Sequence, residues 1–409
     1  MRWWNRRAPL SFSGVALRSV LLPLLFFLLT ACDPHPGPFS DLSSSPLQAS
    51  TGGVYGSDQD PGLLVGVFDV EVSPDGSVYV CQPQVAEVAV FREDGSYSRT
   101  LGGRGSGPGE FQNPGAIRFL ADTLTVLEFG RGITLLSPEG EYYARVSFLL
   151  DPPTGHSFPM APITLLADGN VGCFSPLSAS TVLRGNEVHV QFWLKATRQG
   201  DVLDTLVIQP VDGEYSLVEV PGEQDLTLTH PLAWNDLVTL PPDGSQLVAV
   251  DRSSGFQSSE PAFRLFRINL AGDTTHGREL GYDPAPLTSE EKARISENLA
   301  QRLTRRLNTS VGRLAEIIQE QIHWPPHFPP VSKVVAGSDG TIWLQREDLP
   351  GDSIRWDILG PDLEPQAHVY LSTSLDVKRV SRESVWGVQA GEMDVPAVVR
   401  VDLNGYDDH

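Results

Sequence analysis

Four acidic side chains are the candidates for holding a divalent cation. Asp69 and Glu71 lie in one apolar, strand-like run, Asp236 lies just before a second run, and Asp376 lies just before a third. Carboxylate oxygens are the ligands that hard divalent cations take in proteins, and a cation held in this way can activate water for hydrolysis. The sequence requires no cofactor, but a divalent cation is possible if these four residues converge at one end of the fold.

A second candidate site is basic. Four arginines lie within a dozen residues of an otherwise acidic chain: Arg302, Arg305, Arg306 and Arg313. Guanidinium groups bind carboxylates and phosphates through paired hydrogen bonds, so these residues could bind an anionic ligand. The alternative is an ordinary solvated helix face whose arginines pair with Glu297, Glu316 and Glu320. A run of charged residues is more often a solvated surface of this kind than a binding site.

The overall charge excludes one class of partner. The 409 residues include 30 basic and 51 acidic side chains, which gives a formal net charge of −21. Nucleic-acid binding needs a basic surface that neutralises phosphates. We therefore expect no nucleic-acid partner.

The first 31 residues are typical of an export signal. Basic residues precede the apolar run VLLPLLFFLL at positions 20–29, which is too short to span a bilayer. The run ends in Leu29-Thr30-Ala31-Cys32, which resembles the lipobox of bacterial lipoproteins. That resemblance implies cleavage before Cys32 and a lipid anchor on its thiol, in a membrane of the bacterial cell envelope. Whether this is the inner or the outer membrane stays open.

Residues 32–62 predict a flexible linker between the anchor and the folded part. They are rich in Pro, Gly, Ser and Asp and contain little that could be buried. Two further cysteines follow, Cys81 and Cys173, and each lies beside a strand-like run. Two cysteines are no disulfide framework, so the sequence favours two buried free thiols.

A degenerate repeat organises residues 63–409. Each unit has an apolar strand, an acidic or Asp-Gly turn and a second β-rich strand, and Asp-Gly between such runs is a hairpin signal because primed turns need positive φ. The six hairpins are 68–80, 115–127, 162–174, 237–250, 332–344 and 377–388.

A third strand follows each hairpin, which favours a ring of four-stranded blades. Short strands at a regular spacing of roughly 45 residues, without helices between most of them, are typical of a β-propeller. The chain ends just after the third strand of the sixth unit. A closed ring therefore needs its last strand from residues 50–66, which would also protect the seam. The predicted fold class is all-β, a six-bladed β-propeller.

The innermost strands of such a ring line its central channel. Alignment of the turns places six residues at comparable positions: Glu71, Arg118, Thr164, Thr239, Val335 and Arg379. This ring mixes both signs of charge and contains no carboxylate cluster. It gives the metal site little support.

Two of the units are longer than the rest, and the second of these, between blades four and five, contains a helical insert at about 287–323. Thr288 and Glu291 have the spacing of a capping box. An apolar stripe then runs at helical spacing from Ile295 to Ile322, with a possible break near Asn308.

The glycine-rich segment GGRGSGPGEFQNP (102–114) resembles the blade junction of NHL-type six-bladed propellers, a group related to TolB-like propellers. A dinucleotide-binding loop would need a helix after it, whereas a strand follows here. The resemblance implies a bacterial propeller lipoprotein.

Propeller faces gather loops from all blades, so the favoured function is a binding or interaction scaffold for a protein, peptide or glycan rather than an enzyme. The alternative is a metal-dependent hydrolase resembling lactonases, with its site in the central channel. A third possibility is a sensor or assembly factor that uses the helical insert as its contact surface.

Overall fold

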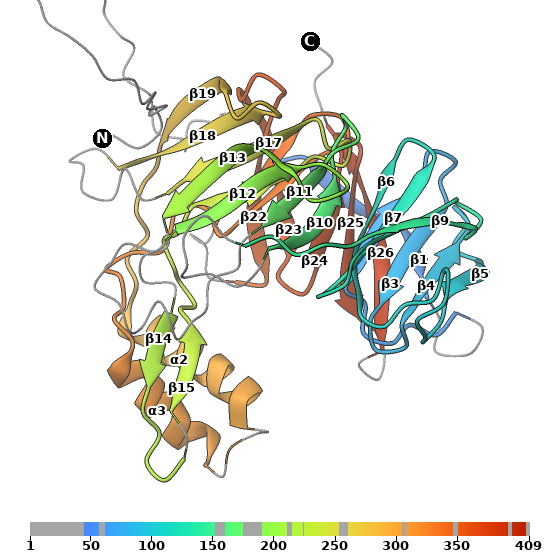
Figure 1. Cartoon of the computed structure of the whole chain (residues 1–409). Helices are drawn as coiled ribbons and strands as arrows, with labels where there is room; N and C mark the ends of the chain where they lie inside the picture. The colour runs from blue at the N-terminus through green and yellow to red at the C-terminus, as the bar shows by residue number, and fades with distance from the viewer. Residues whose placement is uncertain are drawn as a thin grey trace, which may run out of the picture.

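A computed structural model describes residues 45–56, 62–151, 160–174, 190–210, 215–223, 225–252, 261–304, 307, 309–346, 351–391 and 395–405. In these residues the strands form six four-stranded antiparallel sheets and one two-stranded sheet, accompanied by two helices (Figure 1). The six larger sheets are the blades of a closed propeller, as the sequence predicts. The predicted export signal, Cys32 and the first part of the predicted linker lie outside the described residues.

In five blades the strands follow one another from the channel outward. The first three blades consist of β2 (Asp69–Val72), β3 (Val78–Gln82), β4 (Glu87–Phe91) and β5 (Tyr97–Gly102); β6 (Pro114–Leu120), β7 (Thr123–Glu128), β8 (Gly132–Leu136) and β9 (Tyr142–Val146); and β10 (Ala161–Leu165), β11 (Val171–Phe174), β12 (Val190–Ala196) and β13 (Val202–Pro210).

The fourth and fifth blades have the same order. They consist of β16 (Leu237–Thr239), β17 (Gln246–Asp251), β18 (Ala262–Asn269) and β19 (Thr274–Gly281), and of β20 (Lys333–Ala336), β21 (Ile342–Gln345), β22 (Ser353–Leu359) and β23 (Pro365–Ser372).

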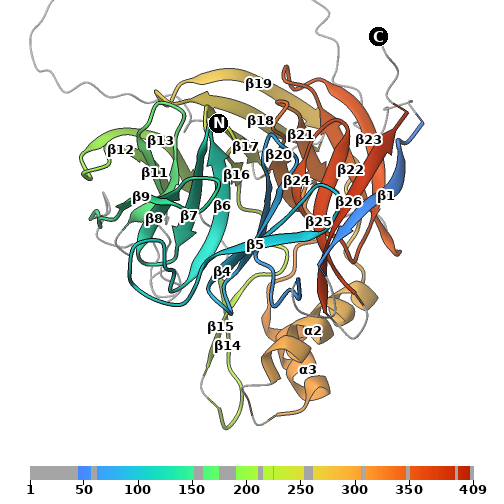
Figure 2. The ribbon, with the colours of Figure 1, turned by 90° about the vertical axis from the view of Figure 1, so that its right-hand side faces the viewer.

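The last blade joins the two ends of the chain. Its inner strands are β24 (Asp376–Val380), β25 (Ser384–Ala390) and β26 (Pro396–Asn404), and its outermost strand is β1 (Gln48–Tyr55). Figure 2 shows β1 beside β26 at the edge of the ring. The closing strand thus comes from the N-terminal side, as predicted, but it begins at residue 48, inside the segment assigned to the linker.

The hairpin turns differ in one respect from the primed turns expected at Asp-Gly. In the first hairpin the Ser73 N–H donates to Ser77 O and the Gly76 N–H donates to Ser73 O, so the loop has three residues and only Gly76 has positive φ, at 81°. This is a type I turn followed by a left-handed residue. The Asp75 carboxylate accepts the Ser77 N–H at 3.2 Å, which explains why an acid precedes the glycine.

Strands that are apolar on both faces hold adjacent blades together. In β3 all five residues are buried, and in β8 the same is true. Blade one packs against blade two through a cluster that includes Tyr79, Phe111 and Ile117. Each blade lies between two others, so its strands are covered on both faces. Their sequences are therefore nearly continuous apolar runs instead of alternating apolar and polar residues.

Cys81 and Cys173 are both buried and free, as the sequence favours. Each lies within the interior of a blade, on β3 and β11. Burial raises the pKa of the Cys173 thiol to about 12, so this thiol stays protonated at neutral pH. Neither cysteine is placed to act as a nucleophile.

The two long intervals form one accessory subdomain. The hairpin of β14 (Tyr215–Val218) and β15 (Leu226–Thr229) precedes β16, and the helices α2 (Ser289–Leu303) and α3 (Val311–Gln321) precede β20. Although about 60 residues separate the hairpin from α2, the two inserts share one core of apolar side chains, which includes Val218, Leu228, Ala300, Leu314 and Ile318. The subdomain projects from one face of the propeller (Figures 1 and 2).

The helices follow the predicted pattern. Thr288 caps α2 in a capping box with Glu291, and the apolar stripe is broken into two helices between residues 303 and 311. In the chain, the helices lie between the fourth and fifth blades when blades are counted from β2, as predicted. If the blade that contains β1 is counted first, the same two blades are the fifth and the sixth. Within the described part of the chain, no helix has the length and apolarity needed to cross a membrane.

Candidate ligand-binding site in the central channel

The innermost strands enclose a cavity of about 320 Å³ on the propeller axis. It is lined from five of the six blades by Phe68, Asp69, Arg118, Thr239, Leu240, Pro242, Lys333, Val334, Val335, Ala336, Val377, Lys378 and Arg379. Four of the six channel positions inferred from turn alignment line this cavity. The cavity is open and its lining mixes cationic and apolar side chains, as in many small-molecule sites.

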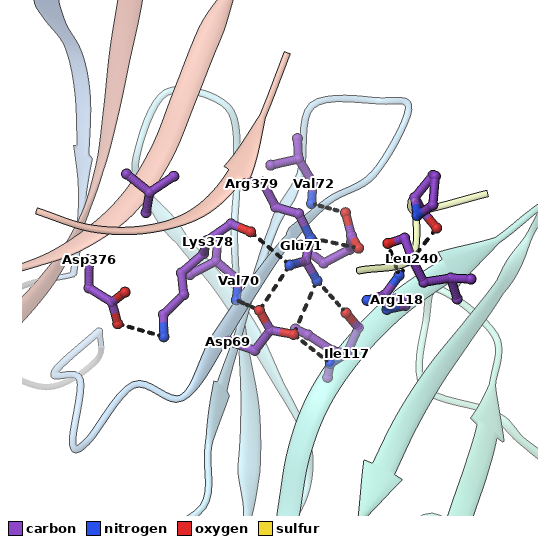
Figure 3. A network of polar contacts seen from close by, with 12 residues as sticks. Asp69, Val70, Glu71, Val72, Ile117, Arg118, Leu240, Asp376, Lys378 and Arg379 are labelled. Atoms are coloured by element: carbon purple, nitrogen blue, oxygen red, sulfur yellow. Dashed lines mark hydrogen bonds and ion pairs between the residues drawn. The ribbon is translucent and has the colours of Figure 1, made fainter. Parts of the chain in front are cut away.

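Arg379 joins the sixth blade to the first by a buried ion-pair network (Figure 3). Its Nη1 and Nη2 atoms each lie 3.1 Å from an oxygen of Asp69, and its Nε lies 3.1 Å from Oε2 of Glu71. The remaining N–H groups donate to Lys378 O at 2.9 Å and Ile117 O at 2.7 Å. All five guanidinium donors are therefore satisfied.

The network also fixes the protonation of Arg379. Burial disfavours the charged guanidinium, but Asp69 and Glu71 outweigh it and hold the pKa of Arg379 above its ordinary value. The two carboxylates accept further backbone N–H groups, from Val70 and Ile117 on Asp69 and from Val72 on Glu71. Their oxygens are thus already bonded to groups of the protein.

Arg118 crosses the channel in another direction. It lies on β6 in the second blade, and its Nη1 donates to Leu240 O at 2.9 Å and Pro241 O at 3.2 Å, beyond the end of β16 in the fourth blade. Burial and the neighbouring Arg379 lower the pKa of Arg118, although Asp69 and Glu71 oppose this. Among the described residues no carboxylate lies within ion-pair distance of Arg118.

The mouth of the cavity carries two lysines that share one carboxylate. Lys333 Nζ lies 2.9 Å from Asp376 Oδ1, and Lys378 Nζ lies 2.7 Å from Asp376 Oδ2. Burial raises the pKa of Asp376, but the hydrogen bonds from Lys378 and Lys333 outweigh burial and hold it below its usual value. The Phe68 ring lies at this mouth, packed edge-on against Phe129 at 5.4 Å, with Lys378 Nζ 5.9 Å from its centre.

The accessory subdomain stands on the same face as this mouth. Phe68 precedes β2, and Lys333 and Asp376 are the first residues of β20 and β24, so the mouth lies where the inner strands begin. The two inserts of the subdomain lead into the starts of β16 and β20. The subdomain therefore flanks the cavity entrance on the side of the fourth and fifth blades.

The four candidate metal ligands do not meet at one point. Asp69 and Glu71 share Arg379, Asp376 pairs with lysines at the mouth, and Asp236 does not line the cavity. In the part of the chain that the structure describes, no group of three or more His, Cys, Asp or Glu side chains is placed to hold a metal ion. The predicted metal site gains no support from this arrangement.

Asp236 lies before β16 in a buried acidic pair. Its side-chain Oδ1 is buried and has no hydrogen-bond partner among the described residues, while its backbone carbonyl accepts the side-chain amide of Gln209. Burial, together with the nearby Asp251, raises the pKa of Asp236 to about 7, and Arg252 offsets only part of this. The carboxyl is consequently protonated in mildly acidic solution.

This shift predicts a pH dependence of stability. Because the folded pKa exceeds the unfolded value of about 3.9, the folded protein binds the extra proton between these values, and stability falls as pH rises through this window. Raising the pH from about 5.5 to about 8.5 should therefore lower the free energy of unfolding by about 2 kcal/mol through this one carboxyl group. Urea unfolding of the chain 32–409 carrying Cys32→Ser, hereafter the soluble reference chain, measures this cost.

Asp236→Asn should remove that pH dependence, since asparagine does not titrate and has nearly the same shape. Asp122→Asn, in the exposed turn between β6 and β7, is the matched control and should leave the pH profile unchanged. Equal pH profiles for Asp236→Asn and the reference chain would contradict the assignment.

The four candidate arginines lie away from the cavity or outside the described residues. Arg302 is exposed in the last turn of α2, where its Nε donates to Asn298 O at 3.3 Å. Arg313 is exposed on α3 and pairs with Glu316 at 3.2 Å, as expected for a solvated helix face. Arg305 and Arg306 lie outside the described residues. A ligand-binding role for the four stays a prediction.

Sequence reasoning placed Arg118 and Arg379 on the channel but missed the lysines beside them. Lys333 and Lys378 each lie one or two residues from a ring position, Val335 and Arg379. Lys333 lies two residues before Val335 and therefore on the same side of β20, whereas Lys378 lies at an irregularity of the β24–β25 register between Val377 and Arg379. The basic residue at the start of β20 was a signal that could have revealed one side of the mouth, whereas the irregularity at Lys378 cannot be inferred from the sequence.

Several solved structures are similar to this chain, at low sequence identity and with TM-scores below 0.5. A member of the DUF4221 family from Bacteroides vulgatus is 10% identical over 88% of this chain and 98% of its own, with a TM-score of 0.48. A protein from Bacteroides fragilis described as exported is 10% identical over 89% and 97%, with a TM-score of 0.43. Virginiamycin B lyase from Staphylococcus aureus is 12% identical over 88% and 99%, with a TM-score of 0.39.

A likeness at these identities and TM-scores carries no conclusion about ligand or activity. No protein-family model matches the chain, and no curated protein sequence does. The function must therefore be argued from the residues of the propeller itself.

Proposed function

We propose that the protein is an exported, lipid-anchored binding protein of the bacterial cell envelope, whose propeller recognises a ligand at the face where its inner strands begin. The observation that carries this proposal is the state of the channel carboxylates. Asp69, Glu71 and Asp376 are all bonded to arginine or lysine, so the cavity is lined by cationic and apolar groups. Such a cavity suits binding rather than metal-assisted hydrolysis.

The sequence of the first 32 residues supports the proposed location in the cell envelope. The basic and apolar segments before Cys32 and the lipobox-like sequence around it favour export and lipidation. About sixteen residues separate Cys32 from the start of β1, and a fully extended chain of that length reaches ~50 Å. The propeller can thus work at a distance from the membrane surface, which its acidic charge also favours.

Fractionation of cells that produce the full chain tests the location. The unmodified chain should enter the membrane fraction and incorporate labelled fatty acid, whereas Cys32→Ser should be released in soluble form without the label. Cys173→Ser is the matched control, because that thiol is buried inside the third blade. Equal membrane retention of the Cys32→Ser variant would contradict the lipid anchor.

Metal analysis tests the binding role against hydrolysis. Elemental mass spectrometry of the soluble reference chain after gel filtration should find far less than one equivalent of calcium, zinc or manganese, even after soaking and desalting. A stoichiometric metal would instead restore the hydrolase hypothesis and point to the channel carboxylates.

A further inference from the structure

We propose that the central cavity binds a small organic anion, with its carboxylate or phosphate head against Arg118 and its apolar body directed toward Phe68. This inference rests on the proposed binding role and adds the chemical class of the ligand. It depends on the described residues of the cavity alone and not on the arginines of the accessory subdomain.

The first argument is the free edge of Arg118. Its Nη1 is used by the carbonyls of Leu240 and Pro241, while the described residues provide no hydrogen-bond acceptor for Nε or Nη2. The Nε–Nη2 edge of a guanidinium is one that binds a carboxylate or phosphate through two parallel hydrogen bonds. Because the two carbonyls hold Nη1, the guanidinium is already oriented before a ligand arrives.

The second argument is the charge balance of the cavity. Its lining includes four cations, Arg118, Lys333, Lys378 and Arg379, and the carboxylates that contact them in the described residues are Asp69, Glu71 and Asp376. Arg379 and the two lysines have carboxylate partners, and Arg118 has none within ion-pair distance. One positive charge therefore stays unneutralised in a partly enclosed site of a protein whose formal net charge is −21.

The third argument concerns the shape of the ligand. Arg118 contacts residues beyond the end of β16, whereas Phe68 precedes the start of β2, so the two mark opposite ends of the cavity along the channel axis. Between them lie Val334 and Val335 of β20, which are partly exposed and offer apolar contact. A cavity of about 320 Å³ is at the small end of ligand sites and suits a compact molecule with one charged head.

Calorimetric titration of the soluble reference chain with benzoate and phenyl phosphate tests the inference. Both probes combine one oxyanion with an apolar ring, and benzamide has the shape of benzoate without its charge. We expect at least one anion to bind in the micromolar to millimolar range, with benzamide at least about tenfold weaker, because a charge-assisted pair is lost. Equal affinity for benzoate and benzamide, or no binding of either anion, would overturn the proposal.

Two variants locate the site. Arg118→Gln should weaken anion binding by at least about tenfold, since the bidentate edge is lost. Arg264→Gln, which makes the same substitution on an exposed side chain of β18 outside every candidate site, should leave the affinity unchanged. If Arg118→Gln does not fold by circular dichroism, Arg118→Lys keeps the charge, and Lys378→Met probes the mouth. Anion binding that is unaffected by all three cavity variants would place the ligand elsewhere and overturn the assignment.

The same titration in EDTA separates this inference from the proposed function. Binding should persist in EDTA, since Arg118 needs no metal to hold an oxyanion. Binding that vanishes in EDTA and returns with calcium or zinc would contradict both the anion site and the metal-free binding role. Absence of binding in both conditions would overturn the anion site alone and leave the envelope location to the fractionation experiment.

Discussion

Replacing Arg379 with methionine should lower the free energy of unfolding of the soluble reference chain by about 3–5 kcal/mol. The variant leaves Asp69 and Glu71 without their cation, and both carboxylates are buried, at 8% and 5% exposure. Removing one partner of a buried pair is costly because the remaining charge loses its compensation without regaining water. Equilibrium unfolding in urea, followed by tryptophan fluorescence, measures the loss.

An exposed arginine–carboxylate pair provides the control. Arg264 lies 2.7 Å from Glu279 on neighbouring strands of the fourth blade, but both side chains are more than two-fifths exposed. Arg264→Met should therefore cost at most about 1 kcal/mol. Equal losses for the two methionine variants would show that the buried network contributes no more than an exposed ion pair.

A triple variant tests the physical reason for the loss. Asp69→Asn and Glu71→Gln, added to Arg379→Met, remove the stranded charges while keeping the side-chain shapes. Stability should recover at least partly, because neutral replacements of a buried ion pair are often tolerated. If the triple variant were less stable than Arg379→Met alone, the loss would come from the missing contacts of the arginine rather than from uncompensated charge.

Much of the propeller was predictable because its signals are local. Each blade begins with a hairpin whose turn contains an acid, usually followed by glycine, as at Asp75 and Gly76, and the apolar alternation on either side indicates strands. The closing strand was predictable by elimination, since the chain ends after a third strand and a ring needs a fourth. The helices were equally visible, because Thr288 and Glu291 form the capping box that their spacing indicates.

The pairings across the channel were not predictable, because they join residues far apart in the chain. Arg379 and Asp69 are 310 positions apart, and only closure of the ring brings them within 3.1 Å. The contact between the β14–β15 hairpin and the helices is of the same kind, as is the ion pair of Lys333 with Asp376, 43 positions away. For this reason three of the four candidate metal ligands, Asp69, Glu71 and Asp376, are paired with arginine or lysine in the structure.

Removal of residues 45–56, which contain β1, should cost more stability than the loss of the Arg379 guanidinium. β1 forms the outer edge of the last blade and pairs with β26 from Gln48↔Asn404 to Tyr55↔Val398. Tyr55 is 1% exposed, packs against Trp386 of its own blade and Phe91 of the first blade, and donates its hydroxyl to Glu93 O at 2.9 Å. The strand therefore joins the sixth blade to the first.

Loss of one large buried side chain costs about 3–5 kcal/mol, and a whole protein has only about 5–15 kcal/mol of stability. The truncated chain also exposes the unpaired edge of β26 and the apolar side chains that Tyr55 covered. We expect it to unfold at a much lower urea concentration or to self-associate through β26, which sedimentation velocity would detect. A monomer that unfolds cooperatively at nearly the same urea concentration as the reference chain would contradict the assignment of β1 as the closing strand.

Point variants and a peptide separate packing from ring closure. Tyr55→Ala should lose about 3–5 kcal/mol, whereas Tyr55→Phe should lose only the hydroxyl bond, about 1 kcal/mol. A synthetic peptide of residues 45–56, added to the truncated chain, should restore its thermal stability by adding the missing strand to β26. A peptide with Tyr55 replaced by alanine should restore less. The proposed lipid anchor on Cys32 would be connected to the propeller through this same strand, so a pull on the anchor would act first on the closure of the ring.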